Sequence, residues 1–120
     1  MAQSSYQLIN LTSNIVLTWP FSFTGGNTVA DINDINPDQD DWTIAMPDAT
    51  LASNGQYVIF NNISAFDVII LDNSLAPITT LDAGDVKELY LYNTSTPEGL
   101  WRVIPYGSVT NAITAVSLRE

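Results

Sequence analysis

The chain has 120 residues, of which 46% are hydrophobic and 13% are charged, and its formal net charge is -10 at pH 7. This length fits one domain, and the apolar content is sufficient for a core without metals or disulfides. The absence of Cys and His excludes disulfides and thiolate chemistry, and three basic residues are too few for the clustered phosphate contacts that nucleic acids or anionic membranes require.

Short apolar and β-branched runs recur along the chain between Gly, Pro, Asn and Asp, a pattern typical of many-stranded sandwiches and barrels. Helical periodicity is nearly absent, and the best helix candidate, residues 82–92, ends in Leu-Tyr-Leu-Tyr, which favours a strand. The sequence therefore predicts an all-β fold, an antiparallel β-sandwich similar to a jelly roll. We expect strands at residues 6–11, 14–19, 42–46, 57–61, 67–71, 78–81, 86–92 and 100–105.

The chain divides into a body and two extended ends. From Gly55 onward each expected strand is followed by a short turn-forming segment, which predicts a C-terminal antiparallel meander. Residues 24–39 are rich in Gly, Asn and Asp and are expected to form a long loop or an irregular edge. We interpret residues 1–23 as an N-terminal arm, 24–107 as the sandwich body and 108–120 as a C-terminal arm. Either the arms pair with neighbouring proteins, or they complete the sheet of their own chain.

Two expected strands are apolar at every position, at residues 57–60 and 68–71. A strand with one face in water would alternate between apolar and polar residues, so both faces of these strands should be covered. With no helices expected, the cover would come from a second sheet and the arms, or from other subunits. The pattern favours an obligate homo-oligomer, and a single-chain sandwich is the alternative.

Acidic residues concentrate between residues 31 and 41. Asp34, Asn36, Asp38 and Asp40 recur at every second position, as oxygen ligands do in calcium-binding loops. The glycine and the bidentate glutamate that an EF-hand requires are both missing, and no flanking helices are expected. The segment is a weak calcium candidate, and its alternative is a solvated acidic loop whose side chains cap turns.

No catalytic arrangement is recognisable in the sequence. A nucleophile elbow, a phosphate-binding loop and a dinucleotide motif are all missing, and the acidic residues fall mainly at turns, where they bond to the backbone. We therefore expect neither an enzyme nor a cofactor. The aromatic residues would permit stacking on sugars, but Trp19, Trp42 and Trp101 each lie in an apolar strand, where core or interface packing is the alternative.

Five segments are informative together: LTWPFSF (residues 17–23), MPDAT (46–50), residues 54–74, residues 80–107 and the trailing SVTNAITAVS. They resemble a module of tailed-bacteriophage structural proteins, found in tail or head fibres and in small head-decoration (cement) proteins. LYNTSTPEGLWRVIPYG (residues 91–107) is the most specific part. The resemblance implies a homotrimeric virion protein without catalytic residues, made in the host cytoplasm, that clamps the major capsid protein or another virion protein at the capsid surface.

A decoration protein is favoured over a long fibre, because the chain ends at Glu120 where a fibre would continue into further repeats. The alternative is a tail or head fibre module that attaches to a receptor glycan. The residues expected to contact neighbouring proteins are Tyr6, Trp19, Phe21, Phe23 and Trp101.

Overall fold

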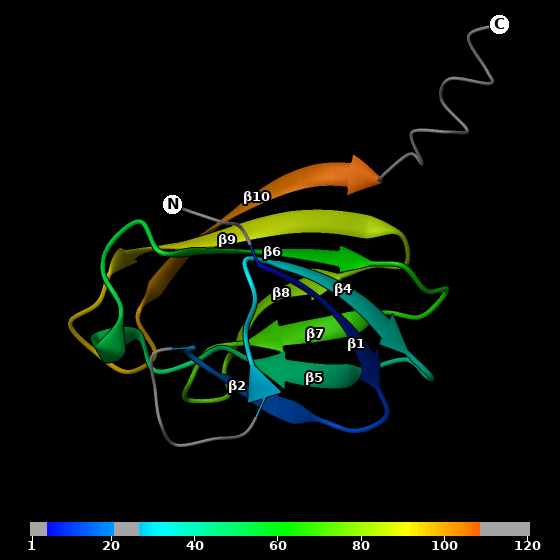
Figure 1. Cartoon of the computed structure of the whole chain (residues 1–120), viewed down its shortest axis with the longest axis horizontal. Coiled ribbons are helices and arrows are strands. Elements are labelled where there is room, and N and C mark those ends of the chain that lie inside the picture. The colour runs from blue at the N-terminus through cyan, green and yellow to red at the C-terminus, as the bar shows by residue number, and fades with distance from the viewer. Residues whose placement is uncertain (1–4, 21–26, 109–120) are drawn as a thin grey trace, which may run out of the picture.

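The computed structural model describes residues 5–20 and 27–108. Within these residues the chain forms ten strands, one 3₁₀ turn and no α-helix, which confirms the expected all-β character. The elements, shown in Figure 1, are β1 (Tyr6–Leu11), β2 (Ile15–Thr18), β3 (Asn27–Thr28), β4 (Ile32–Pro37), β5 (Trp42–Ala45), η1 (Ala49–Leu51), β6 (Tyr57–Asn62), β7 (Val68–Leu71), β8 (Pro77–Leu81), β9 (Asp85–Asn93) and β10 (Leu100–Ser108).

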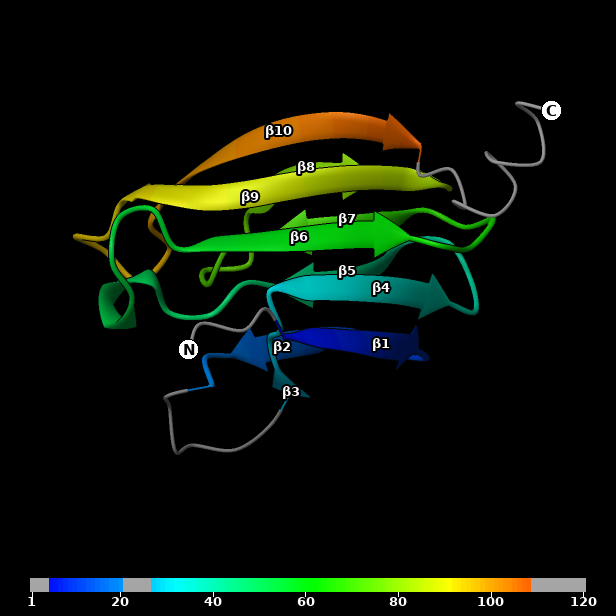
Figure 2. The same cartoon turned by 45° about the horizontal axis from the view of Figure 1, so that its top comes forward.

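The strands form two five-stranded sheets. Sheet I has the order β1-β4-β6-β9-β10, and sheet II has the order β3-β2-β5-β7-β8. Figure 2 shows sheet I in front and sheet II behind it. We call the face of each sheet that points toward the other sheet its inner face, and the opposite face its outer face.

The chain passes repeatedly between the two sheets. Three times along the chain, a strand of sheet I is followed by a strand of sheet II. We call each such pair a rung, and the three rungs are β1/β2, β4/β5 and β6/β7. β1, β4 and β6 pair in parallel, and so do β2, β5 and β7. Parallel strands need a crossover connection, and here each crossover contains a strand of the opposite sheet.

Side chains at the corners connect one rung to the next. The Asn14 Oδ1 atom accepts a hydrogen bond of 2.9 Å from the backbone N–H of Thr43, which lies 29 residues later. The Asp40 Oδ1 atom accepts one of 2.9 Å from Asp67 N–H, and Asp67 Oδ1 in turn accepts one of 3.1 Å from Ala83 N–H. Turn-forming Asn and Asp residues therefore also satisfy backbone donors that lie later in the chain.

The core fills the space between the inner faces. It includes Trp19 and Phe60, the two largest side chains that are fully buried. Two asparagines share this interior at 0% exposure, and both are hydrogen-bonded: Asn33 Nδ2 donates to Ala30 O, and Asn62 Nδ2 donates to Leu81 O. The remaining core residues are Leu11, Leu17, Val29, Ile35, Ile44, Met46, Ala49, Val58, Val68, Ile70, Leu81, Leu89 and Leu91.

The loop before β10 explains part of the motif at residues 91–107. Gly99 has a φ of +63°, and a Cβ there would lie 2.5 Å from the Ala49 Cβ and 2.7 Å from the Leu91 Cδ2. Only glycine fits both the backbone conformation and the contact. The next strand is anchored by Trp101, whose Nε1 donates to Glu98 O at 3.0 Å and whose ring packs against the core.

The expected purely antiparallel arrangement is wrong, because both sheets are mixed. From Gly55 onward the chain forms two hairpins, β7-β8 in sheet II and β9-β10 in sheet I, rather than one continuous meander. Turn residues mark where a strand ends but do not indicate which sheet the next strand joins. Residues 32–37 form β4 rather than a loop, since Asn33 and Ile35 alternate into the core despite the low strand propensity of Asn and Asp.

The expected N-terminal arm at residues 1–23 also needs correction. Its described part forms β1 and β2, which are integral to the two sheets, and Leu11, Leu17 and Trp19 are each only 1% exposed. Apolar alternation in β1 and β2 places these residues inside the chain's own core. Of the expected C-terminal arm at 108–120, Ser108 ends β10 and the remainder lies outside the described residues.

Two neighbouring residues of β2 test this assignment. Leu17→Ala should lower the free energy of unfolding by about 2–5 kcal/mol, because it opens a cavity in the core. Val16→Ala is the matched control, since Val16 is 51% exposed on the outer face, and its effect should stay within about 0.5 kcal/mol. Urea unfolding measures both, and equal small effects would show that residues 15–18 are an arm after all.

Candidate functional site

The outer face of sheet I carries all five tyrosines of the chain. Tyr57 on β6 lies directly opposite Tyr90 on β9, and both alternate with buried residues of the core. Exposure is 61% for Tyr6, 57% for Tyr106, 39% for Tyr92 and 38% for Tyr57. We call this surface the tyrosine face, and it consists of Tyr6, Leu8, Tyr57, Tyr90, Tyr92, Ile104 and Tyr106.

Polar contacts hold three of these rings in place across neighbouring strands. The Tyr6 hydroxyl donates a 2.7 Å hydrogen bond to Asp34 Oδ2, and Asp34 Oδ1 accepts another from Asn61 Nδ2 at 3.1 Å. At the other side of the sheet, the Tyr106 hydroxyl donates to Glu88 Oε1 at 2.7 Å. The Arg102 guanidinium carbon lies 4.0 Å from the centre of the Tyr92 ring, within the range of a cation–π contact.

The two hydroxyl contacts alter the acidity of the phenols. The pKa of Tyr6 is raised from its ordinary value, mainly by the hydrogen bond to Asp34, with smaller contributions from desolvation and from the Asp34 charge. The pKa of Tyr106 is raised in the same way by Glu88. Both hydroxyls therefore lose their protons at higher pH than an unperturbed tyrosine does.

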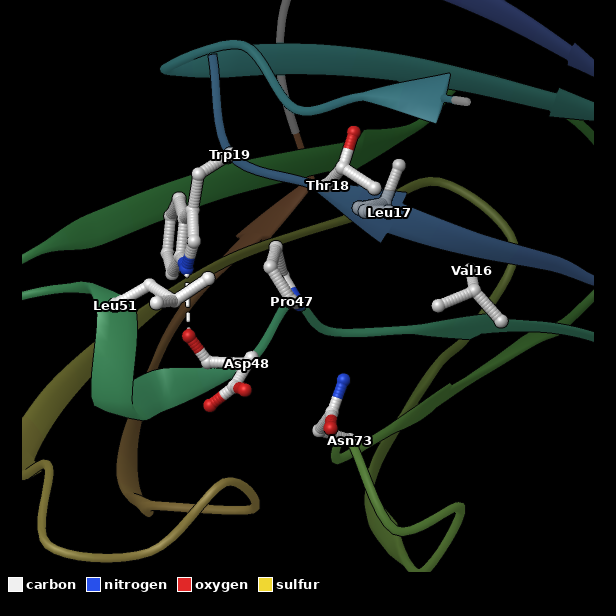
Figure 3. Close-up of a pocket in the computed structure, with 8 residues that line it drawn as sticks. All are labelled: Val16, Leu17, Thr18, Trp19, Pro47, Asp48, Leu51 and Asn73. Carbon is white, nitrogen blue, oxygen red and sulfur yellow. Dashed lines mark hydrogen bonds between the residues drawn. The ribbon is translucent and has the colours of Figure 1, made fainter. Parts of the chain in front are cut away.

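A shallow hollow lies at the end of β2, beside η1 (Figure 3). Its volume is about 300 Å³. Trp19 forms one wall, and its Nε1 donates to the backbone oxygen of Asp48 at 2.8 Å. The Asp48 carboxylate caps η1 by accepting from Thr50, and Asn73 Nδ2 donates to Met46 O. The Asp48 and Asn73 side chains thus serve local structure, and among the described residues Asp48 is the single ionisable group lining the hollow.

The four calcium candidates do not converge on one point. Asp34 and Asn36 lie on the outer face of β4, where Asp34 bonds to Tyr6 and Asn36 Nδ2 donates to Asn10 Oδ1. Asp38 Oδ1 accepts from Trp42 Nε1 at 2.6 Å, and Asp40 accepts from Asp67 N–H. Across residues 5–20 and 27–108, no three Asp or Glu side chains gather so as to hold a metal ion. The alternation of the four oxygens is thus a consequence of strand and corner geometry.

The five residues expected to contact neighbouring proteins lie in different places. Tyr6 is on the tyrosine face, whereas Trp19 is a core residue with an exposure of only 1%. Trp101 is half-buried against the core. Phe21 and Phe23 lie outside the described residues.

Sequence reasoning missed the tyrosine face as a unit. The run Leu89-Tyr90-Leu91-Tyr92 indicated one strand with leucines on one side and tyrosines on the other. Tyr6, Tyr57 and Tyr106 join the same face because β1 pairs with β4, β4 with β6, β6 with β9 and β9 with β10. Those pairings link positions far apart in the chain, which no local pattern reveals.

Comparison with known proteins adds no relative: no protein family, no curated protein and no solved structure matches this chain. The described part of the chain has no helix that is long and apolar enough to span a membrane.

The tyrosine contacts can be tested by alkaline titration. Asp34→Asn should return the pKa of Tyr6 toward the ordinary value of about 10, so that one tyrosine ionises at lower pH than in the parent protein. Because the folded pKa is raised, the stabilising contribution of the bond is complete below about pH 10 and is lost as the pH rises through the folded pKa. The ultraviolet absorbance of tyrosinate measures the titration.

Asp72→Asn is the control for this titration, since Asp72 caps a turn and accepts from Ser74 N–H. It should leave every tyrosine unchanged. Identical titration curves for Asp34→Asn and the parent protein would contradict the Tyr6–Asp34 contact.

Proposed function

We propose that this protein is a structural binding protein that docks on a neighbouring protein through its tyrosine face. The more specific proposal is a capsid decoration, or cement, protein of a tailed phage, which binds between capsid subunits and stabilises the head. The observation that carries the docking role is the exposure of four tyrosine rings and two aliphatic side chains on one sheet face. The virion assignment rests on the sequence resemblance at residues 17–107.

The composition of this face is that of a protein interface. Tyr and Arg are enriched at the centres of such interfaces, where they supply most of the binding energy. The tyrosine face contains five tyrosines, and Arg102, one of only three basic residues in the chain, lies against the Tyr92 ring. Leu8 and Ile104, exposed by 48% and 37%, add apolar area beside the rings.

The fixed positions of the rings also favour tight binding. Ordering a side chain on association costs free energy, and Tyr6 and Tyr106 already have their hydroxyls bonded to carboxylates of adjacent strands. Asp34 and Glu88 bring negative charge to the same face of a chain whose net charge is -10. The partner surface that complements it has apolar pockets with Lys or Arg around them.

Decoration would stabilise a head by mass action. A protein that binds assembled capsid subunits, and not the separated ones, shifts the equilibrium toward the assembled lattice. This role needs a rigid module with an exposed contact face and no catalytic group. The two sheets with their shared core supply the rigid module, and sheet I supplies the contact face.

A fibre module that binds a receptor glycan is the second candidate. The observation in its favour is again the row of exposed rings, because tyrosine faces stack on the apolar faces of sugars. The two candidates differ in the partner that the tyrosine face selects, a capsid protein or a free glycan.

Binding to heads of the phage that encodes the chain, purified without it, distinguishes the two. The double variant Tyr57→Ser/Tyr92→Ser should weaken cosedimentation with these heads by about tenfold or more, since each truncated anchor costs more than about 1 kcal/mol. The matched control is Leu51→Ser/Leu75→Ser, whose residues are 54% and 60% exposed and lie away from sheet I.

Two outcomes would overturn the proposal. If the parent protein binds neutral or acidic glycans on an array and ignores the heads, the receptor module replaces the decoration role. If both double variants bind heads as well as the parent does, the tyrosine face is not the contact surface.

A further inference from the structure

The edge strand β1 differs from the other sheet edges in having nothing that blocks strand pairing. It spans six residues, and β4 is its one neighbour among the described residues. Exposed edge strands invite pairing with other chains, and proteins usually block them with charge, proline, bulges or very short length. β1 contains no proline or charged residue, and its register with β4 is unbroken.

The other three sheet edges all carry such blocks. β10 contains Arg102 and Pro105, and its register with β9 shifts twice. β8 begins with Pro77 and has a register shift against β7. β3 is only two residues long. Within residues 5–20 and 27–108, β1 is thus the one sheet edge without such a block.

The backbone of β1 is oriented for pairing on its open side. The carbonyl oxygens of Ser5 and Leu11 accept hydrogen bonds from Ile32 N–H and Asp38 N–H, so the odd-numbered residues face β4. Backbone groups of successive residues in a strand point to opposite sides. The N–H and C=O groups of Tyr6, Leu8 and Asn10 therefore point to the open edge.

The distribution of charged residues along the chain favours a second copy as the partner of this edge. The chain carries a net charge of -10, yet Met1 to Ala30 contains no Asp, Glu, Lys or Arg. Two copies that meet through most surfaces bring like charges together, whereas the terminal rung formed by β1 and β2 is free of charged side chains. The nearest carboxylates, Asp31 and Asp34, lie on the β4 side of β1, away from its open edge.

We propose that β1 pairs antiparallel with β1 of a second copy, about a two-fold axis at Leu8. In this register Leu8 lies opposite Leu8 of the second copy, and Tyr6 lies opposite its Asn10. Tyr6, Leu8 and Asn10 each point their N–H and C=O groups to the open edge. Each of them therefore forms a hydrogen-bonded pair with the residue opposite it in the second copy. A two-fold interface uses the same patch on both copies, and the β1 edge is self-complementary in this sense.

The dimer joins the two copies of sheet I into one continuous sheet. A two-fold axis perpendicular to the sheet keeps both tyrosine faces on the same side. The dimer consequently presents two copies of the proposed contact face to one partner surface, and linked sites bind more tightly than either site alone. The pairing itself depends only on the β1 edge and holds whether or not the tyrosine face binds a capsid.

Native mass spectrometry and sedimentation velocity of the full chain at micromolar concentration test the pairing. The expected mass is twice 13.1 kDa. Leu8→Lys should convert the protein to monomer, because it places two like charges opposite each other at the axis. Leu100→Lys is the matched control, since Leu100 has the same exposure of 48% but lies on β10, and it should remain dimeric.

Proline substitution gives a second, backbone-specific test. Leu8→Pro removes an N–H that points to the open edge, so the fold should persist while the dimer is lost. Ile9→Pro removes an N–H directed at β4 and should instead lower the melting temperature. A monomeric or trimeric parent protein, or a Leu8→Lys variant that stays dimeric, would overturn the proposal.

Discussion

The parallel pairing of strands that lie about one rung apart in the sequence is the constraint on which the rest of this structure depends. Each rung contributes one strand to each sheet, and corner hydrogen bonds accepted by Asn14 and Asp40 fix its position relative to the next rung. This stacking brings the inner residues of all three rungs into one core. It also leaves the outer residues in register, so that side chains distant in sequence form one surface.

The outer surface that results is unusual for sheets with so much parallel pairing. Parallel sheets are ordinarily covered on both faces, commonly by helices, and the described part of this chain has no α-helix to cover them. Apolar and aromatic side chains consequently remain on the outer face of sheet I. This face is the proposed contact surface, and its rings are held by Asp34, Glu88 and Arg102.

Local sequence signals predicted most strands but not their arrangement. The expected strands at residues 42–46, 57–61 and 100–105 each overlap an observed one, because apolar runs bounded by turn residues are local features. β4 was missed because its pattern mixes Asp and Asn with isoleucine, and its burial comes from neighbours in other rungs. The strand register could not be predicted for the same reason, because it pairs residues far apart in the sequence. Asn36, for example, donates a hydrogen bond to Asn10, which lies 26 residues earlier. Trp19 could be recognised as buried, but whether in its own core or in an interface depends on that register.

The proposed decoration role, with contact through the outer face of sheet I, is tested most directly by a map at side-chain resolution of a phage head to which the protein is bound. We expect Tyr57, Tyr90 and Tyr92 to lie against capsid subunits, with the outer face of sheet II and the hollow beside η1 turned away from them. A map in which the tyrosine face points into solvent while another surface holds the capsid would contradict it.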